Sequence, residues 1–457
     1  MDKPVDLQEP LEELARDPTR FSHDLKFPPA EKIRVYDDTL RDGEQMPGVA
    51  ITPKDKYELA RMLSDIGVHI MDVGFPAVSE SERETLRLVL DGRKRGDLRP
   101  DLEVVCMMRS TQGDIDATMK VVDSLGYKRD EVTYFIFTSA SDLHVKYKLG
   151  KTLLRREGIP ESEWLELPVW FYRAANLRML CEAIRYAREQ GATSIEFGGE
   201  DGSRADVNYI AEIHSEGLRA GGTRPSTPDT VGCYSPFAVR EYIPQIKAAA
   251  PDAPLVVHFH NDLGIGAWNT VVALGSGAEV FTTSVNGIGE RTGNAPMHQV
   301  LLQLRYLFGI EIPGFKYEKL RDLARHLELV SGIPVQPTEP GIGLNVFSHE
   351  SGIHTAGMLI HPAIYQFIPP EDMGAKIEYV YGKHSGAVVI EHALRDAGIR
   401  PEPKLVEGVL EEVKRIREER AEQTDFSDFH RRYYEHLNRL GLTAAEVVDI
   451  AQALIAH

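Results

Sequence analysis

Residues 33–66, IRVYDDTLRDGEQMPGVAITPKDKYELARMLSDI, contain a short run of β-forming residues, a polar loop and a longer amphipathic stretch. This order predicts a strand over residues 33–37 and a helix over residues 53–66. The same pair of elements recurs along the following chain. Further strands are expected at residues 69–73, 102–107, 132–138, 194–197, 224–228, 255–260 and 280–285. Further helices are expected at residues 83–92, 172–190, 205–220 and 236–249.

Eight strand–helix units within roughly 280 residues match the size and order of a (β/α)8 TIM barrel, so we expect an α/β fold of that class. A doubly wound sheet is the main alternative, but no glycine-rich fingerprint follows the first predicted strand. The alternation stops after residue 310. A proline-containing linker, a small mixed region over residues 341–396 and a charge-dense, helical C-terminal region are expected to follow.

These features divide the chain into four parts: an N-terminal extension (1–29), a barrel (30–310), a linker and subdomain (311–396) and a helical C-terminal region (397–457). Residues 150–167 are polar and longer than an ordinary connection between a strand and a helix. We expect them to form an insertion after the fourth strand, either a lid or a surface excursion.

The composition limits the classes of partner. A formal charge of −18 argues against nucleic acid or an anionic membrane as the main partner, because such a surface repels polyanions. The chain has no signal-peptide pattern and no apolar run long enough to span a membrane. Its three scattered cysteines fit a reducing compartment, so we expect a cytoplasmic protein.

Polar residues follow the predicted strands at the end of a barrel where active sites form. The candidates for substrate binding or catalysis at these positions are Arg41, Gln45, Asp72, Arg109, Ser139, Glu200, Thr230 and Glu290.

The HFH sequence at residues 258–260 is the sharpest chemical signal. Residues two apart on a strand share a face, so His258 and His260 can both point into the barrel mouth. Two imidazoles and a carboxylate can bind a divalent ion and leave positions open for substrate. We choose Asp42 as the carboxylate, and Asn294 in the glycine-rich loop after the last strand as a further oxygen ligand.

Several segments together resemble one family, the 2-isopropylmalate and homocitrate synthases of the DRE-TIM metallolyases. They are DDTLRDGEQMPGV (37–49), SASDLHVKYKLGK (139–151), PDTVG (228–232), HFHNDLG (258–264), NGIGERTGNAP (286–296), FSHESGIH (347–354) and GKHSG (382–386). The resemblance covers roughly residues 30–395 in the family's order. It is specific for the family and much less specific for the substrate.

The resemblance implies an acyltransferase that condenses acetyl-CoA with a 2-oxo acid, using Mg²⁺, Mn²⁺ or Zn²⁺ held by Asp42, His258 and His260. The 2-oxo acid would chelate the metal, Thr230 would bind its carboxylate, and Arg41 would stabilise charge on the keto oxygen.

The resemblance also implies a homodimer in which the subdomain after the barrel reaches over the partner's active site. His354 would then act in trans as the general base for the thioester methyl group, assisted by a tyrosine, Tyr379 or Tyr381.

Residues 196–201, EFGGED, bear on the choice of 2-oxo acid. Homocitrate synthases usually place an arginine and a serine where this chain has Glu196 and Gly198. A second carboxylate on the substrate would meet repulsion from Glu196, so 2-oxoglutarate is disfavoured. Gly198 leaves more room than the serine found in the family. Either the pocket accepts a larger or unusual 2-oxo acid, or the glycine lies on a loop and has no effect on the substrate.

The pattern is therefore most like that of 2-isopropylmalate synthase. Homocitrate, citramalate, Re-citrate and phosphonomethylmalate synthases remain open as alternatives. A lyase of the hydroxymethylglutaryl-CoA type is disfavoured because the loop after the eighth strand lacks a cysteine. A non-catalytic barrel that binds metal or acyl-CoA is disfavoured because the predicted catalytic and metal-binding residues are all present.

Overall fold

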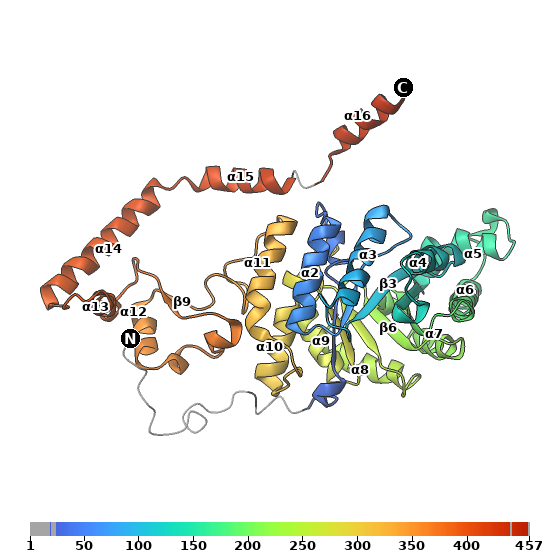
Figure 1. Ribbon diagram of the computed structural model, residues 1–457, viewed down its shortest axis with the longest axis horizontal. Coiled ribbons are helices and arrows are strands. Elements are labelled where there is room, and N and C mark those ends of the chain that lie inside the picture. Colours follow the sequence, from blue (N-terminus) through green and yellow to red (C-terminus); the bar gives the residue numbers. More distant parts are fainter. Residues whose placement is uncertain (1–18, 20–23, 439–440, 456–457) are drawn as a thin grey trace. The chain divides into compact units, whose positions relative to one another are not determined.

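The computed structural model describes residue 19, residues 24–438 and residues 441–455. Its centre is a closed barrel of eight parallel strands in sequential order, surrounded by helices (Figure 1). The strands are β1 (Arg34–Asp37), β2 (Ile70–Asp72), β3 (Glu103–Arg109), β4 (Thr133–Ser139), β5 (Ser194–Glu200), β6 (Arg224–Asp229), β7 (Val256–Phe259) and β8 (Val280–Thr283). The predicted TIM barrel is confirmed.

Helices connect the strands on the outside of the barrel. They are α2 (Pro53–Ile66), α3 (Glu80–Arg95), α4 (Gln112–Ser124), α5 (Gly150–Arg156), α6 (Val169–Glu189), α7 (Val207–Arg219), α8 (Pro236–Lys247) and α9 (Gly266–Leu274). Two further helices, α10 (Met297–Phe308) and α11 (Leu320–Ser331), follow the last barrel strand. Capping residues set where these helices begin and end, as α2 illustrates. In α2 the Thr52 side chain accepts a hydrogen bond from the Asp55 N–H, and Gly67 ends the helix at φ 114°.

The chain divides into two compact units. The barrel unit comprises residues 22–316 and 326–332, and the other unit contains residues 317–325 and the chain from 333 onward. In the second unit β9 (Ser348–His349) pairs in parallel with β10 (Glu378–Tyr379). Its helices beyond residue 333 are α12 (Gly352–Ile360), α13 (Ala387–Asp396), α14 (Pro403–Gln423), α15 (Phe426–Asn438) and α16 (Ala444–Ile455).

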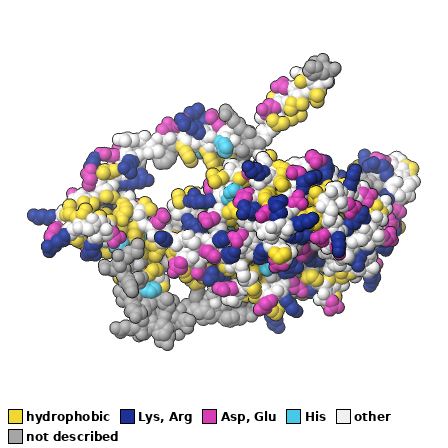
Figure 2. Space-filling view, viewed as in Figure 1, with side chains coloured by type: hydrophobic (Ala, Val, Ile, Leu, Met, Phe, Trp, Pro, Cys, Tyr) yellow, Lys and Arg dark blue, Asp and Glu magenta, His cyan; other side chains and the backbone are white. Residues whose placement is uncertain are grey.

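Charges of both signs are interspersed over the visible face of the barrel (Figure 2). Among the described residues, every helix is too short or too polar to cross a lipid bilayer.

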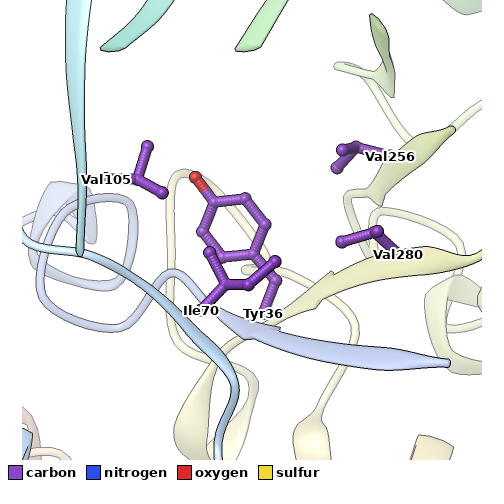
Figure 3. Close-up of a cluster of buried hydrophobic side chains, with 5 residues drawn as sticks. All are labelled: Tyr36, Ile70, Val105, Val256 and Val280. Atoms are coloured by element: carbon purple, nitrogen blue, oxygen red, sulfur yellow. The ribbon is translucent and has the colours of Figure 1, made fainter. Parts of the chain in front are cut away.

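Side chains from alternate positions fill the barrel interior in layers, as strand periodicity requires. One layer is an apolar cluster around the Tyr36 ring (Figure 3). Its other members are Ile70, Val105, Val256 and Val280. A second layer is charged: Arg34 and Arg224 both bind Glu103, at 3.2 and 2.7 Å, and Arg224 also binds Glu196. The barrel is thus a packed core with a polar end.

Residues 150–167, expected as an insertion, contain α5, which buries Leu153 and Leu154. Two details differ from the sequence-based expectations. The chain after residue 310 does not go directly into a linker, since α11 comes first. Strand β5 continues to Glu200 through two glycines, whereas the sequence predicted an end at residue 197.

The close packing of β5 against its neighbours explains the glycine at position 198. An added Cβ at this position would lie 2.3 Å from the backbone oxygen of Ser226 on β6. A side chain at Gly199 would similarly lie 2.6 Å from the Ala140 Cβ. The close approach of neighbouring strands therefore requires glycine here. This accounts for Gly198 without the larger substrate that its small volume suggested.

We expect Gly198→Ala to destabilise the barrel by roughly 1–3 kcal/mol, because the colliding atom belongs to backbone that cannot turn aside. The measurement is the midpoint of thermal unfolding, compared with that of wild type. Gly113→Ala on α4 is the matched control, since nothing lies within 4 Å of its added Cβ. Helix propensity predicts an unchanged or higher midpoint for that variant. Equal midpoints for the two variants would contradict the packing argument.

Candidate active site

A cavity of about 290 Å³ opens at the carboxyl ends of the barrel strands. Most residues that the sequence singled out line it. These are Arg41, Asp42, Gln45, Glu196, Gly198, Glu200, Thr230, His258, His260 and Glu290. They come from loops and strands up to some 250 positions apart in the chain, so the barrel closure is what brings them together.

Asp42, His258 and His260 converge inside this cavity. One ligand atom from each lies within 4.8 Å of the others, and all three residues are buried. The two histidine Nε2 atoms are 3.2 Å apart, and Asp42 Oδ2 is 3.6 Å from His258 Nε2. A carboxylate oxygen and two imidazole nitrogens are a donor set that divalent transition metals and Zn²⁺ accept. The residues present therefore fit a divalent metal ion.

Two neighbours fix the orientation of His258. Its Nδ1 atom is 3.0 Å from Asp38 Oδ2 and 2.7 Å from Thr282 Oγ1, which leaves Nε2 to face the cavity. Burial alone lowers the pKa of His258, but the hydrogen bond and charge of Asp38 raise it above the ordinary value. A carboxylate behind a histidine is the usual support for a metal-binding imidazole.

Burial and the neighbouring His258 lower the pKa of His260 to about 4. Burial raises the pKa of Asp42, but Arg41 and the two histidines overcome this effect and hold it well below its usual range. Near neutral pH the site therefore offers a neutral His260 and an ionised Asp42. Metal binding needs these protonation states, and it also requires His258, whose pKa is raised, to give up its proton at Nε2.

Arg41 holds three buried carboxylates together. Its guanidinium contacts Asp72 at 2.8 Å, Asp42 at 2.7 Å and Asp38 at 3.1 Å. Burial raises the pKa of Asp72 to about 7, against the opposing effect of Arg41. Because one cation is shared among several buried carboxylates, negative charge is in excess there, and a divalent cation would offset it.

The Thr230 hydroxyl is also held in place. The Asp201 N–H donates to Thr230 Oγ1 at 2.8 Å, and an Arg291 NH2 group donates to the Thr230 carbonyl at 2.6 Å. Asp201 adopts a left-handed conformation with φ 64° while its carboxylate is buried against Ser141 and Arg204. Because Thr230 Oγ1 already accepts a hydrogen bond, its own hydrogen is available to an acceptor in the cavity.

Glu196 has a partner that the sequence argument did not include. Its Oε2 atom is 2.9 Å from Arg224 Nε, and both side chains are almost fully buried. Burial raises the pKa of Glu196 to about 7, although Arg224 opposes that shift. Arg109 and Lys146 are engaged elsewhere: Arg109 forms a two-pronged ion pair with Asp114, and Lys146 donates to backbone carbonyls.

Four other predicted residues do not line the cavity. Asp72 supports Arg41 from behind, and the Arg109 side chain is 61% exposed in its pair with Asp114. Ser139 is buried at the end of β4, where its carbonyl accepts from Asn176. Asn294 is buried beside His260, across an isolated bridge, and its amide helps to lower the pKa of Asp42.

His354 and Tyr379 belong to the other compact unit. The His354 ring lies 4.3 Å from the Tyr365 ring, centre to centre. Tyr379 instead faces His392, with ring centres 5.7 Å apart. Within this unit the tyrosine that contacts His354 is therefore Tyr365, which the sequence analysis did not single out.

The sequence analysis gave no role to Lys148, Arg291 or Arg224. Lys148 and Arg291 line the cavity, and Lys148 pairs with Glu200. Both lie in segments that carried the family resemblance, so their motifs could have indicated them. Arg224 is the first residue of the sixth predicted strand, and no sequence pattern indicates that it forms an ion pair with Glu196.

Comparison with known proteins agrees with this geometry. The HMGL-like family matches residues 32–156 and 171–327, and the homocitrate synthase post-HMGL domain-like family matches residues 342–421. The gap between the two ranges of the HMGL-like match, from residue 156 to residue 171, overlaps the predicted insertion at residues 150–167.

Named relatives cover most of the chain. Homocitrate synthase AksA of Methanopyrus kandleri is 36% identical over 86% of this chain and 90% of its own. A probable 2-isopropylmalate synthase of Ignicoccus hospitalis is 38% identical over 87% and 90%. A 2-isopropylmalate synthase of Sulfurisphaera tokodaii is 33% identical over 85% and 92%. The chain belongs to the HMGL-like family, among the 2-isopropylmalate and homocitrate synthases.

Proposed function

We propose that the protein condenses acetyl-CoA with a 2-oxo acid, forming a 2-hydroxy-2-carboxymethyl acid and free CoA. The observation that carries this proposal is the convergence of Asp42, His258 and His260 in a buried cavity beside Arg41. Relatives that match nearly the whole chain are named as synthases of this type. 2-Isopropylmalate synthase is the activity we favour within the class.

Asp42, His258 and His260 would hold Mg²⁺, Mn²⁺ or Zn²⁺, with Asn294 as a further oxygen donor. When bound, such an ion polarises a carbonyl group and orients a chelating substrate. The chain's own groups supply the rest. Thr230 donates its free hydroxyl hydrogen to the substrate carboxylate, and Arg41 stabilises negative charge that grows on the keto oxygen. Glu290 and Gln45 stand at the cavity mouth as further polar contacts.

His354 would remove a proton from the methyl group of the thioester. We propose Tyr365 as its assisting tyrosine in place of Tyr379, because only Tyr365 is in ring contact with it among the described aromatic pairs. We further propose a homodimer in which the unit that carries His354 serves the partner's barrel. The new carbon–carbon bond would then form between the methyl carbon and the keto carbon, and hydrolysis would release CoA.

The substrate side chain should carry no second carboxylate. Arg224 neutralises Glu196 but is shared with Glu103, so it offers no uncompensated positive charge to a further anion. Phe135, Phe137 and Met107 add apolar walls to the cavity. Both features favour 2-oxoisovalerate over 2-oxoglutarate.

Thiol release with acetyl-CoA, a divalent metal and a panel of 2-oxo acids tests the proposed function. We expect 2-oxoisovalerate to exceed 2-oxoglutarate in kcat/KM by at least on the order of tenfold, because a buried unpaired carboxylate costs more than 1.4 kcal/mol. Pyruvate, oxaloacetate and 3-phosphonopyruvate complete the panel. Thiol release with none of these acids would refute the function, and a preference for 2-oxoglutarate would refute the argument from Glu196.

Metal dependence is expected from the same triad. Chelation should abolish thiol release, and Mg²⁺, Mn²⁺ or Zn²⁺ should restore it. His260→Ala should lower the metal content of the purified protein, measured by atomic spectroscopy, while leaving the midpoint of thermal unfolding of metal-free protein close to that of wild type. Arg109→Ala is the control, because Arg109 lies outside the cavity and should not alter metal content. Full activity without metal would contradict the assignment.

His354→Ala should lower kcat by a factor on the order of 10²–10⁴, the usual contribution of a general base. The KM for the 2-oxo acid should change little, because other residues bind that substrate. Tyr365→Phe should lower kcat by a smaller factor, whereas Tyr379→Phe should keep it near the wild-type value. A larger loss with Tyr379→Phe than with Tyr365→Phe would show that the assisting tyrosine has been misassigned.

A further inference from the structure

Two polar side chains lie inside the barrel below the metal-binding triad. Tyr36 on β1 is two positions before Asp38, which follows that strand, and Glu196 is two positions before Gly198 on β5. Residues two apart on a strand share a face, so both project into the barrel beneath the cavity's upper residues. Both line the same cavity as His258 and His260. They therefore form part of its floor.

The Tyr36 hydroxyl is buried and unpaired. The residue is 1% exposed, and Tyr36 Oη has no hydrogen-bond partner within the part of the chain that the structure describes. Its ring lies among Val105, Val256 and Val280 (Figure 3). A buried hydroxyl without a partner forfeits hydrogen-bond stabilisation. A ligand that reaches the floor and bonds to Tyr36 recovers that energy.

Glu196 gives the floor its second hydrogen-bonding group. Arg224 binds one of its two carboxylate oxygens, Oε2. The charged layer around it is balanced, because Arg34 and Arg224 face Glu103 and Glu196. A carboxylate at the end of a substrate side chain would add an unbalanced negative charge there. A hydroxyl would add none and could bond to Tyr36 and Glu196 alike.

We propose that Tyr36 and Glu196 form a hydrogen-bonding floor that selects a 2-oxo acid whose side chain ends in an uncharged polar group, a hydroxyl above all. The proposal rests on the proposed condensation of acetyl-CoA with a 2-oxo acid, and within that class it replaces 2-oxoisovalerate with a hydroxylated acid of similar size as the favoured substrate. A hydrocarbon side chain such as that of 2-oxoisovalerate fits the apolar walls but leaves Tyr36 unpaired. A hydroxylated side chain of the same size satisfies both the walls and the floor.

An isosteric pair of substrates tests this selection in the full-length enzyme with acetyl-CoA and metal. 2-Oxopentanoate and 4-hydroxy-2-oxobutanoate differ only in a terminal methyl or hydroxyl group. We expect kcat/KM to favour the hydroxy acid by on the order of tenfold, because a site built to bond a hydroxyl discriminates against the analogue that lacks it. Tyr36→Phe should remove most of this preference.

Tyr186→Phe on α6 is the matched control, since its hydroxyl bonds to Asp116 on the surface and should not affect the ratio. Calorimetric binding of the two acids to metal-loaded wild-type enzyme without acetyl-CoA gives a second readout that needs no variant. Equal use and equal binding of the two acids by the wild type would overturn the proposal. An unchanged ratio in Tyr36→Phe would overturn the role of Tyr36. No thiol release with any 2-oxo acid would overturn the proposed function itself, and the selection with it.

Discussion

The ion-pair cluster around Arg41 is the interaction on which the rest of the site depends. Its guanidinium holds Asp42, a proposed metal ligand, together with Asp38, which orients His258, and Asp72 at the end of β2. Buried carboxylates this close would repel each other without a shared cation. Arg41 therefore links the segment after β1 to the end of the neighbouring strand β2 and helps to fix the positions from which the metal ligands act.

The barrel interior combines apolar packing with buried charge. The Tyr36 cluster supplies ordinary hydrophobic burial, whereas the layer of Arg34, Glu103, Arg224 and Glu196 is stabilised by mutual ion pairs. Replacing one member of such a network leaves the others unpaired in a buried site, which costs more than the pair contributes. The floor of the cavity is therefore polar because the fold itself requires these buried ion pairs.

Sequence patterns predicted the eight strands, their order and many of the polar residues that line the cavity, because strand alternation and the barrel rule fix which side chains reach the mouth. They failed where the outcome depends on contacts between distant segments. The pairing of Arg224 with Glu196, the strand contact that requires Gly198 and the Tyr365–His354 ring contact leave no local periodic signal. Arg109 was misleading for a different reason, since its partner Asp114 is a nearby residue in the first turn of α4 and holds the side chain outside the cavity.

A crystal of the protein soaked with Mn²⁺ and 2-oxoisovalerate tests the central claim most directly, through anomalous diffraction at the manganese edge. The account predicts one strong peak bonded to Asp42, His258 and His260, with the 2-oxo acid beside it and its carboxylate at Thr230. A peak at other side chains, or a 2-oxo acid bound away from the triad, would contradict the account.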